Sequence, residues 1–526
     1  MSKIKNAKFI APLVLSKFLK KDSVQRKRIN AFLAQQMGKE KGLWLKFGQL
    51  LSLKTESWEG LEKLTQEHEV PSLEKEDILP YIEHLFSEVE KSFEEEFPQI
   101  TFPGLAASLS QVHHIKDKEN NDWVIKVKLP DIENVLKDQL NILGLAKIVT
   151  PVQSEKRRFS IDDYQSSITQ NFQKELDYEN ERKNIQTFSI LEQKFCSAKV
   201  AKCHPNIQSP DFTIMTKLKG STWKEVIENF SFKDKRKLAN NLISQFIYQY
   251  FYMGVAQGDF NPGNFFFEKT LKEDVVIKWI DLGQCLRPEK VKRKALFDVI
   301  QSITLSDQVN LKTPNKMTSE ISLGPIFSAW NFNLDKLAPI ASKLPLLLTK
   351  IFTPFSYNFA FNLNNWHLKK DFEQILGDDK WWFRTAGEPD LFLSIRCWIG
   401  LFDMLKQLNV PIFFKGIWQE CSYEIGELLS DITLPDSELK NIKLDDISKN
   451  LNVKIIRSGI EKVNVTLPSR ALEDLDTFLS ARVKDEIKNA GIDLKNIVTQ
   501  QLQNGLLPGK VLDVTLSEEH YIVTLI

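Results

Sequence analysis

The chain has 526 residues, of which 42% are hydrophobic and 26% charged, and its formal net charge is +1. This length exceeds what one ordinary hydrophobic core supports, so we expect a main body with appended parts. A nearly neutral chain without a basic patch interleaved with aromatic residues does not indicate a nucleic-acid partner. No stretch is apolar enough to cross a bilayer, because even Leu391–Leu405 is interrupted by Arg396 and Asp403. The five scattered cysteines show no metal-binding spacing and no secretory context, so we expect a cytoplasmic, reducing compartment.

The first 28 residues form a basic arm, with nine Lys or Arg residues opposed by Asp22 alone. Its apolar run, Phe9–Leu15, lacks the small-residue cleavage site of a signal peptide. We expect a surface helix that makes peripheral contact with an anionic membrane. A solvated basic tail is an equally good interpretation, and the pattern alone does not exclude a targeting segment.

In the first half of the chain, the residue pattern changes from one typical of helices to one typical of strands near residue 100. Apolar residues at helical spacing predict helices over Arg28–Leu51 and Ile78–Phe97. The β-branched run Trp123–Leu129 predicts a strand that ends at Pro130, where a ladder would lose its donor. A helix over Ile161–Leu191 and a strand over Phe212–Met215 follow. These elements indicate a small mixed lobe.

The second half is mainly helical as far as about residue 435, apart from a strand–loop–strand region at 255–284. Beyond residue 440 the texture changes again, which indicates a small α+β module. In that module we expect four strands and two helices, over Val453–Ile456, Lys462–Thr466, Lys510–Leu516, Tyr521–Ile526, Ala471–Lys488 and Leu494–Gln503.

Three polar residues in the 255–284 region have the spacing of a phosphoryl-transfer site. Asp259 is followed five residues later by Asn264, and a largely apolar run then leads to Asp281 in Asp-Leu-Gly. Kinases use this layout because phosphoryl transfer needs hard oxygen ligands for magnesium and an acceptor for the attacking hydroxyl's proton. We assign Asn264 and Asp281 as metal ligands and Asp259 as the catalytic residue that accepts the proton. Taken alone, the segment around Asp259 is equally consistent with a simple turn.

A lysine and an acidic helix face upstream complete the pattern. Lys126 lies inside an apolar strand, as the phosphate-anchoring lysine of kinases does, although a strand lysine more often points to solvent. Asp177, Glu181 and Asn184 are spaced i, i+4 and i+7, which predicts one shared helix face. Glu175 lies round the helix from Glu181, so we assign Glu181 as the partner of Lys126.

The chain resembles the UbiB/AarF family of atypical protein kinase-like proteins over roughly residues 25–300. Lys46-Phe47-Gly48-Gln49 is similar to the family's Lys-x-Gly-Gln motif, and Leu105–His113 to its alanine-rich loop. Glu175-Leu176-Asp177 matches its Glu-x-Asp motif. Where the family has two histidines and a proline, this chain has Gln257, Asn261 and Phe260, and Leu282 and Leu105 also depart from its motifs. None of these changes removes a metal ligand or the catalytic acceptor.

The resemblance implies an α+β, bilobal protein-kinase-like fold with an N-terminal helical extension and a small C-terminal α+β module. We expect residues 1–99 to form the basic arm and helical extension, 100–217 the N-lobe, 218–435 the C-lobe and 436–526 the module. The cofactors implied are ATP and Mg, with catalytic Asp259, Lys126 and Glu181 and metal ligands Asn264 and Asp281. The implied nucleotide-binding residues are Ala106, Ala107, Ser108, Lys126, Met215, Lys46, Gln49, Glu175 and Asp177.

The resemblance favours ATP hydrolysis, or transfer to a small or lipid-like client of isoprenoid-lipid or quinone metabolism, over protein phosphorylation. In the family, the Lys-x-Gly-Gln helix occupies the space where a protein substrate would dock. One rival hypothesis is a pseudokinase scaffold in which bound nucleotide regulates a partner complex. A third is a lipid-binding adaptor that uses the basic arm and aromatic segments such as Phe352–Phe355, although such segments are more often core.

Overall fold

The computed structural model describes residues 72–106, 109–134, 137, 173–271, 274–305, 321–437, 439 and 442–526. These residues separate into two compact units. The first contains the described residues up to Asn229 together with Asn261–Cys285, and the second contains Phe230–Phe260 and Leu286–Ile526.

The first unit contains an antiparallel five-stranded sheet in the order β1-β3-β4-β6, with β2 paired to β3. Helix α5 packs on this sheet, and the rings of Phe86 and Phe212 stack with their centroids 4.8 Å apart. The elements are α5 (Lys75–Glu88), α6 (Phe93–Glu96), β1 (Gln99–Ile100), β2 (Leu105–Ala106), β3 (Ser110–Lys116), β4 (Asp122–Lys128) and β6 (Phe212–Thr216). The strands predicted over 123–129 and 212–215 are therefore confirmed.

The single helix predicted over Ile78–Phe97 is wrong, because two helices occupy that segment. Helix α5 ends at Glu88, and Glu90 has a left-handed φ of 58°, which a continuing helix does not tolerate. A new helix, α6, starts after Ser92, whose side chain accepts a hydrogen bond from the Glu95 amide. The apolar spacing continues across the break because both helices bury residues against the same sheet.

A second sheet of the first unit has the order β5-β9-β8, with β5 parallel and β8 antiparallel to β9. The buried Trp279 at the end of β9 contacts Phe188 of α9, with ring centroids 5.7 Å apart, and Phe265 of β8, at 5.0 Å. The elements are α9 (Tyr178–Lys194), β5 (Ala198–Val200), α10 (Trp223–Asn229), η5 (Pro262–Asn264), β8 (Phe265–Lys269) and β9 (Val275–Trp279), and the short β10 (Cys285–Leu286) follows. This packing fixes α9 against the strand that leads to Asp281.

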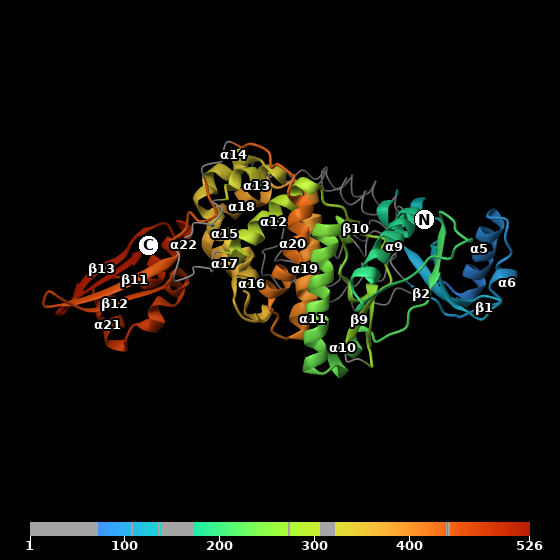
Figure 1. The fold of residues 1–526 in the computed structure, drawn as a ribbon, viewed down its shortest axis with the longest axis horizontal. Helices are drawn as coiled ribbons and strands as arrows, with labels where there is room; N and C mark the ends of the chain where they lie inside the picture. Colours follow the sequence, from blue (N-terminus) through green and yellow to red (C-terminus); the bar gives the residue numbers. More distant parts are fainter. Residues whose placement is uncertain are drawn as a thin grey trace, which may run out of the picture. The chain divides into compact units, whose positions relative to one another are not determined.

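The second unit begins with a mainly helical part in which α11 packs against both α19 and α20 (Figure 1). Trp418 of α20 is fully buried there and meets Phe251 edge-on at 5.2 Å between centroids. The elements are α11 (Phe232–Ile247), the π-helix η4 (Tyr248–Met253), β7 (Ala256–Gln257), α12 (Lys290–Leu305), α13 (Leu323–Ala329), α14 (Leu334–Leu337), η6 (Ala338–Lys343), α15 (Leu344–Ile351), α16 (Thr353–Ser356), η7 (Leu363–Asn365), α17 (Leu368–Leu376), η8 (Gly377–Asp379), α18 (Lys380–Ala386), α19 (Pro389–Leu408) and α20 (Phe414–Leu429). Among the described helices, α19 included, none combines the length and apolarity that crossing a membrane requires.

The tail of the second unit contains an antiparallel sheet in the order β12-β11-β14-β13 (Figure 1). Its elements are β11 (Asn450–Arg457), β12 (Ile460–Pro468), η9 (Ser469–Phe478), α21 (Ala481–Asn489), α22 (Leu494–Gln503), β13 (Gly509–Leu516) and β14 (Glu519–Leu525). The one long helix predicted over Ala471–Lys488 is wrong, because Ser480 caps a new helix by accepting from the Val483 amide.

The tail shares a hydrophobic core with the preceding helices. Leu451, Leu475 and Leu512 belong to the same buried cluster as Leu344 and Ile375. The predicted domain boundaries stay predictions, but the tail and these helices are stabilised by one core.

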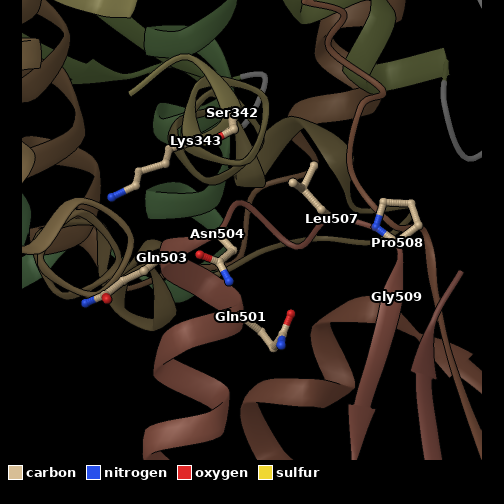
Figure 2. Close-up of a pocket in the computed structure, with 8 residues that line it drawn as sticks. All are labelled: Ser342, Lys343, Gln501, Gln503, Asn504, Leu507, Pro508 and Gly509. Carbon is tan, nitrogen blue, oxygen red and sulfur yellow. The ribbon is translucent and has the colours of Figure 1, made fainter. Parts of the chain in front are cut away.

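A hollow of about 450 Å³ lies where the end of α22 and the start of β13 meet the end of η6 (Figure 2). Gly505, with φ +83°, closes this junction, since a Cβ there would overlap the carbonyl oxygen of Ser342. The residues that line the hollow are Ser342, Lys343, Gln501, Gln503, Asn504, Leu507, Pro508 and Gly509.

Candidate functional site

Lys126 lies in the middle of β4, with its amino group drawn into the first unit rather than toward solvent. Only 8% of the residue is exposed. Its Nζ lies 2.9 and 3.1 Å from the two carboxylate oxygens of Glu181 and 3.1 Å from Oδ2 of Asp281. The predicted ion pair with Glu181 is present, and Lys126 in addition bridges two carboxylates from different elements.

The electrostatics of this cluster hold Lys126 in its charged form. Burial by itself would lower the pKa of Lys126, but the carboxylates of Asp281 and Glu181 outweigh it and raise that pKa well above its usual value. Burial raises the pKa of the Glu181 carboxyl, and the Lys126 ammonium opposes that rise. The ring of Tyr178, centred 5.6 Å from Nζ, adds a cation–π contact on one side of the lysine.

Helix α9 presents Glu181 and Asn184 together on its buried face. Both side chains are fully buried, and Asn184 Nδ2 donates to the carbonyl oxygen of Leu282 at 2.8 Å. Asp177 does not share this face as predicted, because it precedes the helix and caps it, its Oδ1 accepting from the Asn180 amide at 2.9 Å. Helix α9 therefore positions the partner of Lys126 and also supports the loop after Asp281.

Glu175 contacts the loop after Asp281 through Gln284. Its carboxylate accepts a hydrogen bond from Gln284 Nε2 at 2.8 Å. This contact agrees with the expectation that Glu175 does not share Lys126 with Glu181. Gln284 was missed by the sequence reasoning, and only its place directly after Asp-Leu-Gly could have drawn attention to it.

Asp281 and Asn264, the predicted metal ligands, both belong to the first unit and lie on neighbouring backbone. The amide of Ile280 donates to the carbonyl oxygen of Asn264 at 3.2 Å, so the segments that carry the two residues are tied together. Asp281 Oδ1 accepts from the Gly283 amide at 3.0 Å, and 39% of the Asp281 side chain is exposed. The accessible carboxylate of Asp281 fits magnesium, which protein sites bind through one or two carboxylates together with substrate phosphates.

Asp259, the predicted catalytic acceptor, belongs to the second unit. Its amide donates to Gln257 Oε1 at 3.3 Å, and the Gln257 amide donates to Gln249 Oε1 at 3.1 Å. The interpretation that relates Asp259 to the metal ligands still rests on its position five residues before Asn264.

Comparison with known proteins identifies the segment that carries these residues. Residues 65–314 match the family model of the ABC1 atypical kinase-like domain. This segment is an ABC1 atypical kinase-like domain. The family includes the UbiB/AarF proteins, so the resemblance inferred from the motifs is confirmed.

Individual proteins are also similar to this chain. An uncharacterised protein of the hydrogenase 1 5' region of Clostridium pasteurianum is 24% identical over 383 residues, which are 64% of this chain and 67% of that protein. The structure of the Rv3197–erythromycin complex from Mycobacterium tuberculosis has a TM-score of 0.50 and 17% identity, and the match covers 66% of this chain and 83% of that one. The Rio2 kinase–ADP/Mg²⁺–phosphoaspartate complex from Chaetomium thermophilum is a weaker match, with a TM-score of 0.26, 13% identity and coverage of 49% and 74%.

The ABC1 domain contains most of the predicted site residues, but part of the prediction lies outside the described residues. Lys46 and Gln49 precede the matched segment and lie outside the described residues, as the basic arm does. Ala107 and Ser108 also lie outside the described residues. The backbone of Ala106 belongs to β2 and pairs with Gln111 of β3. Met215 is buried on β6 opposite Val124, two residues before Lys126 on β4. The nucleotide-contacting roles of these residues stay predictions.

Proposed function

We propose that this ABC1-domain protein is an ATP- and magnesium-dependent phosphotransferase or ATPase. The observation that supports the proposal most strongly is the buried Lys126 held between Glu181 and Asp281, because a structural strand lysine has no need of two carboxylates from separate elements. In this role Lys126 binds the nucleotide phosphates and Glu181 orients its amino group.

The remaining roles follow from the chemistry of phosphoryl transfer. Asn264 and Asp281 would hold magnesium, which neutralises charge on the phosphates. Asp259 accepts the proton of the attacking water or hydroxyl. The new bond forms between that oxygen and the γ-phosphorus, the bond from the γ-phosphorus to the bridging oxygen breaks, and ADP leaves.

The phosphoryl acceptor that we propose is water or a small, lipid-like substrate of the isoprenoid or quinone-precursor class. The family resemblance supports this, and the basic arm at residues 1–28 supports peripheral contact with an anionic membrane. Comparing the full chain with a variant lacking residues 1–28 in vesicle sedimentation tests the membrane contact. If the full chain and the shortened variant bind anionic vesicles equally, residues 1–28 do not provide the membrane contact.

The decisive experiment measures ATP turnover by the full-length protein, with and without anionic vesicles or a quinone precursor. Asp281→Asn should lower the rate roughly a hundredfold or more, because it removes a charged metal ligand. Asp378→Asn, at an exposed aspartate of η8, is the matched control and should leave the rate unchanged. Equal rates for wild type and Asp281→Asn would show that the turnover does not arise at this site.

A nucleotide-binding scaffold is the second candidate, and one feature of the structure favours it. Lys126 donates to one carboxylate oxygen of Asp281 and the Gly283 amide donates to the other, so a metal would compete with both contacts. In that case ATP should raise the melting temperature while no phosphate is released. Nucleotide-dependent stabilisation without turnover under every condition would establish the scaffold and reject the enzyme.

A further inference from the structure

Arg293 is a buried arginine in an unusual electrostatic position. It lies in the first turn of α12, where a helix dipole disfavours positive charge, and only 7% of the residue is exposed. Within the described ranges no carboxylate forms an ion pair with it, and its Nε is buried without a hydrogen-bond partner. A buried cation without a carboxylate is costly, so its position calls for an explanation.

The guanidinium of Arg293 instead binds the backbone at the end of the π-helix η4. Nη1 donates to the carbonyl oxygen of Phe251 at 2.8 Å and to that of Tyr252 at 3.4 Å. The last carbonyls of a helix carry partial negative charge, so a cation is favoured there. Single turns of π-helix are often found at functional sites.

The chain leaves η4 through Gly254, which packs directly on the guanidinium. Gly254 has φ +67°, and a Cβ at this position would lie 2.8 Å from Cζ of Arg293. Its amide donates to the carbonyl oxygen of Gln249, which also accepts from the Val255 amide at 3.1 Å. The turn between η4 and β7 is therefore closed on one side by Arg293 and on the other by Gln249.

The same turn determines the backbone that carries Asp259. The Gln249 side chain accepts from the Gln257 amide at 3.1 Å, and the Gln257 side chain accepts from the Asp259 amide at 3.3 Å. Cys397 of α19 donates through Sγ to the Gln257 carbonyl oxygen at 2.7 Å. A continuous set of contacts within the second unit thus connects Arg293 to Asp259.

We propose that Arg293 is a positioning residue for Asp259, because its guanidinium fixes the turn that leads from η4 into the segment carrying the catalytic carboxylate. This inference rests on the proposed function. A small displacement of a catalytic group can cost about a hundredfold in rate, so the contacts of Arg293 determine kcat although Arg293 itself touches no substrate.

Arg293→Ala in the full-length protein tests the proposal through three measurements. The first is kcat for ATP turnover, which should fall roughly ten- to a hundredfold, while KM for ATP changes little, since the contacts among Lys126, Glu181 and Asp281 lie in the first unit. The second is hydrogen exchange of the amides of residues 255–260, which should accelerate. The third is chemical rescue, in which millimolar guanidinium, but not sodium at equal ionic strength, should restore part of kcat.

Two further variants keep the test decisive if Arg293→Ala folds poorly. Gly254→Ala should displace the guanidinium and shift the same measurements, and Arg293→Lys, which keeps the charge but not the planar fork, should be intermediate. Arg236→Ala, at an exposed arginine of α11, is the matched control and should change none of them.

A folded Arg293→Ala variant with unchanged kcat and unchanged hydrogen exchange over residues 255–260 would overturn the proposal. A variant whose melting temperature falls while kcat and this exchange stay unchanged would overturn it as well. If the wild type turns over no ATP, the proposed function fails. The exchange measurement then still decides whether Arg293 fixes the segment.

Discussion

Lys126 Nζ and Asp281 Oδ2 lie 3.1 Å apart, although 155 positions separate the two residues in the chain. Because Glu181 contacts the same ammonium at 2.9 Å, one buried cation faces two carboxylates, of which Glu181 is fully buried and Asp281 is partly exposed. In the proposed mechanism, the partly exposed carboxylate of Asp281 would exchange the lysine for a metal ion. The buried carboxylate of Glu181 would then keep the lysine in position.

Removal of Lys126 should leave Glu181 as a buried charge without a partner. We expect Lys126→Met to lower the free energy of unfolding by about 3–5 kcal/mol, because breaking a buried ion pair on one side is strongly destabilising. The double variant Lys126→Met/Glu181→Leu should recover most of that loss, since both charges are then absent. Urea denaturation of the single and double variants measures the difference. Additive losses would contradict a coupled buried pair.

The side chain of Asn184 should support the loop after Asp281. Asn184→Leu removes the hydrogen bond to the Leu282 carbonyl oxygen and leaves that oxygen with only a weak thiol donor, Cys285 Sγ at 3.4 Å, at a cost of about 1–3 kcal/mol in unfolding free energy. The KM for magnesium-ATP should also rise, because the loop follows Asp281, the metal ligand that we propose. Gln186→Leu, at an exposed position of the same helix, is the control and should alter neither quantity. An unchanged KM in a destabilised Asn184→Leu protein would limit Asn184 to a structural role.

Cys203 should react slowly with alkylating reagents at neutral pH. Burial, assisted by the nearby negative charge of Glu181, raises the pKa of the Cys203 thiol to about 11. The reactive thiolate is then only about a thousandth of the population at pH 8, and its fraction grows about tenfold per pH unit until the pKa is reached. Mass spectrometry of iodoacetamide-treated protein should show the exposed Cys196 labelled well before Cys203. A labelling rate of Cys203 that levels off below pH 9 would contradict this prediction.

Two glycines of the tail offer a matched test of the junction at α22. Gly491→Ala should cost about 1–2 kcal/mol, because alanine is forced into the left-handed region at φ +74° while no atom lies within 4 Å of the added Cβ. Gly505→Ala should cost distinctly more, since the same strain at φ +83° is combined with overlap on the Ser342 carbonyl oxygen. Denaturation midpoints of the two variants give the comparison. Equal losses of stability in the two variants would mean that the backbone around Ser342 moves easily to make room for the added Cβ.

Much of the local structure was predictable because it depends on neighbouring residues. The β-branched run around Lys126 forms β4, and helix α22 has the predicted limits Leu494–Gln503. The breaks at Glu90 and Ser480 escaped prediction because the apolar spacing continues on both sides of each break. A pattern of apolar residues reports which face is buried, but it does not show where the backbone turns.

The sequence by itself determined that this chain carries Lys126, Asp259, Asn264 and Asp281 in the order of an atypical kinase, because motif spacing is a property of the chain. The tertiary structure alone decided the contacts that no motif predicts. It placed Gln284 on Glu175 and Arg293 on the end of η4, contacts for which no spacing rule exists. These contacts join residues 109 and 42 positions apart, and only the packing of the core brings such distant segments together.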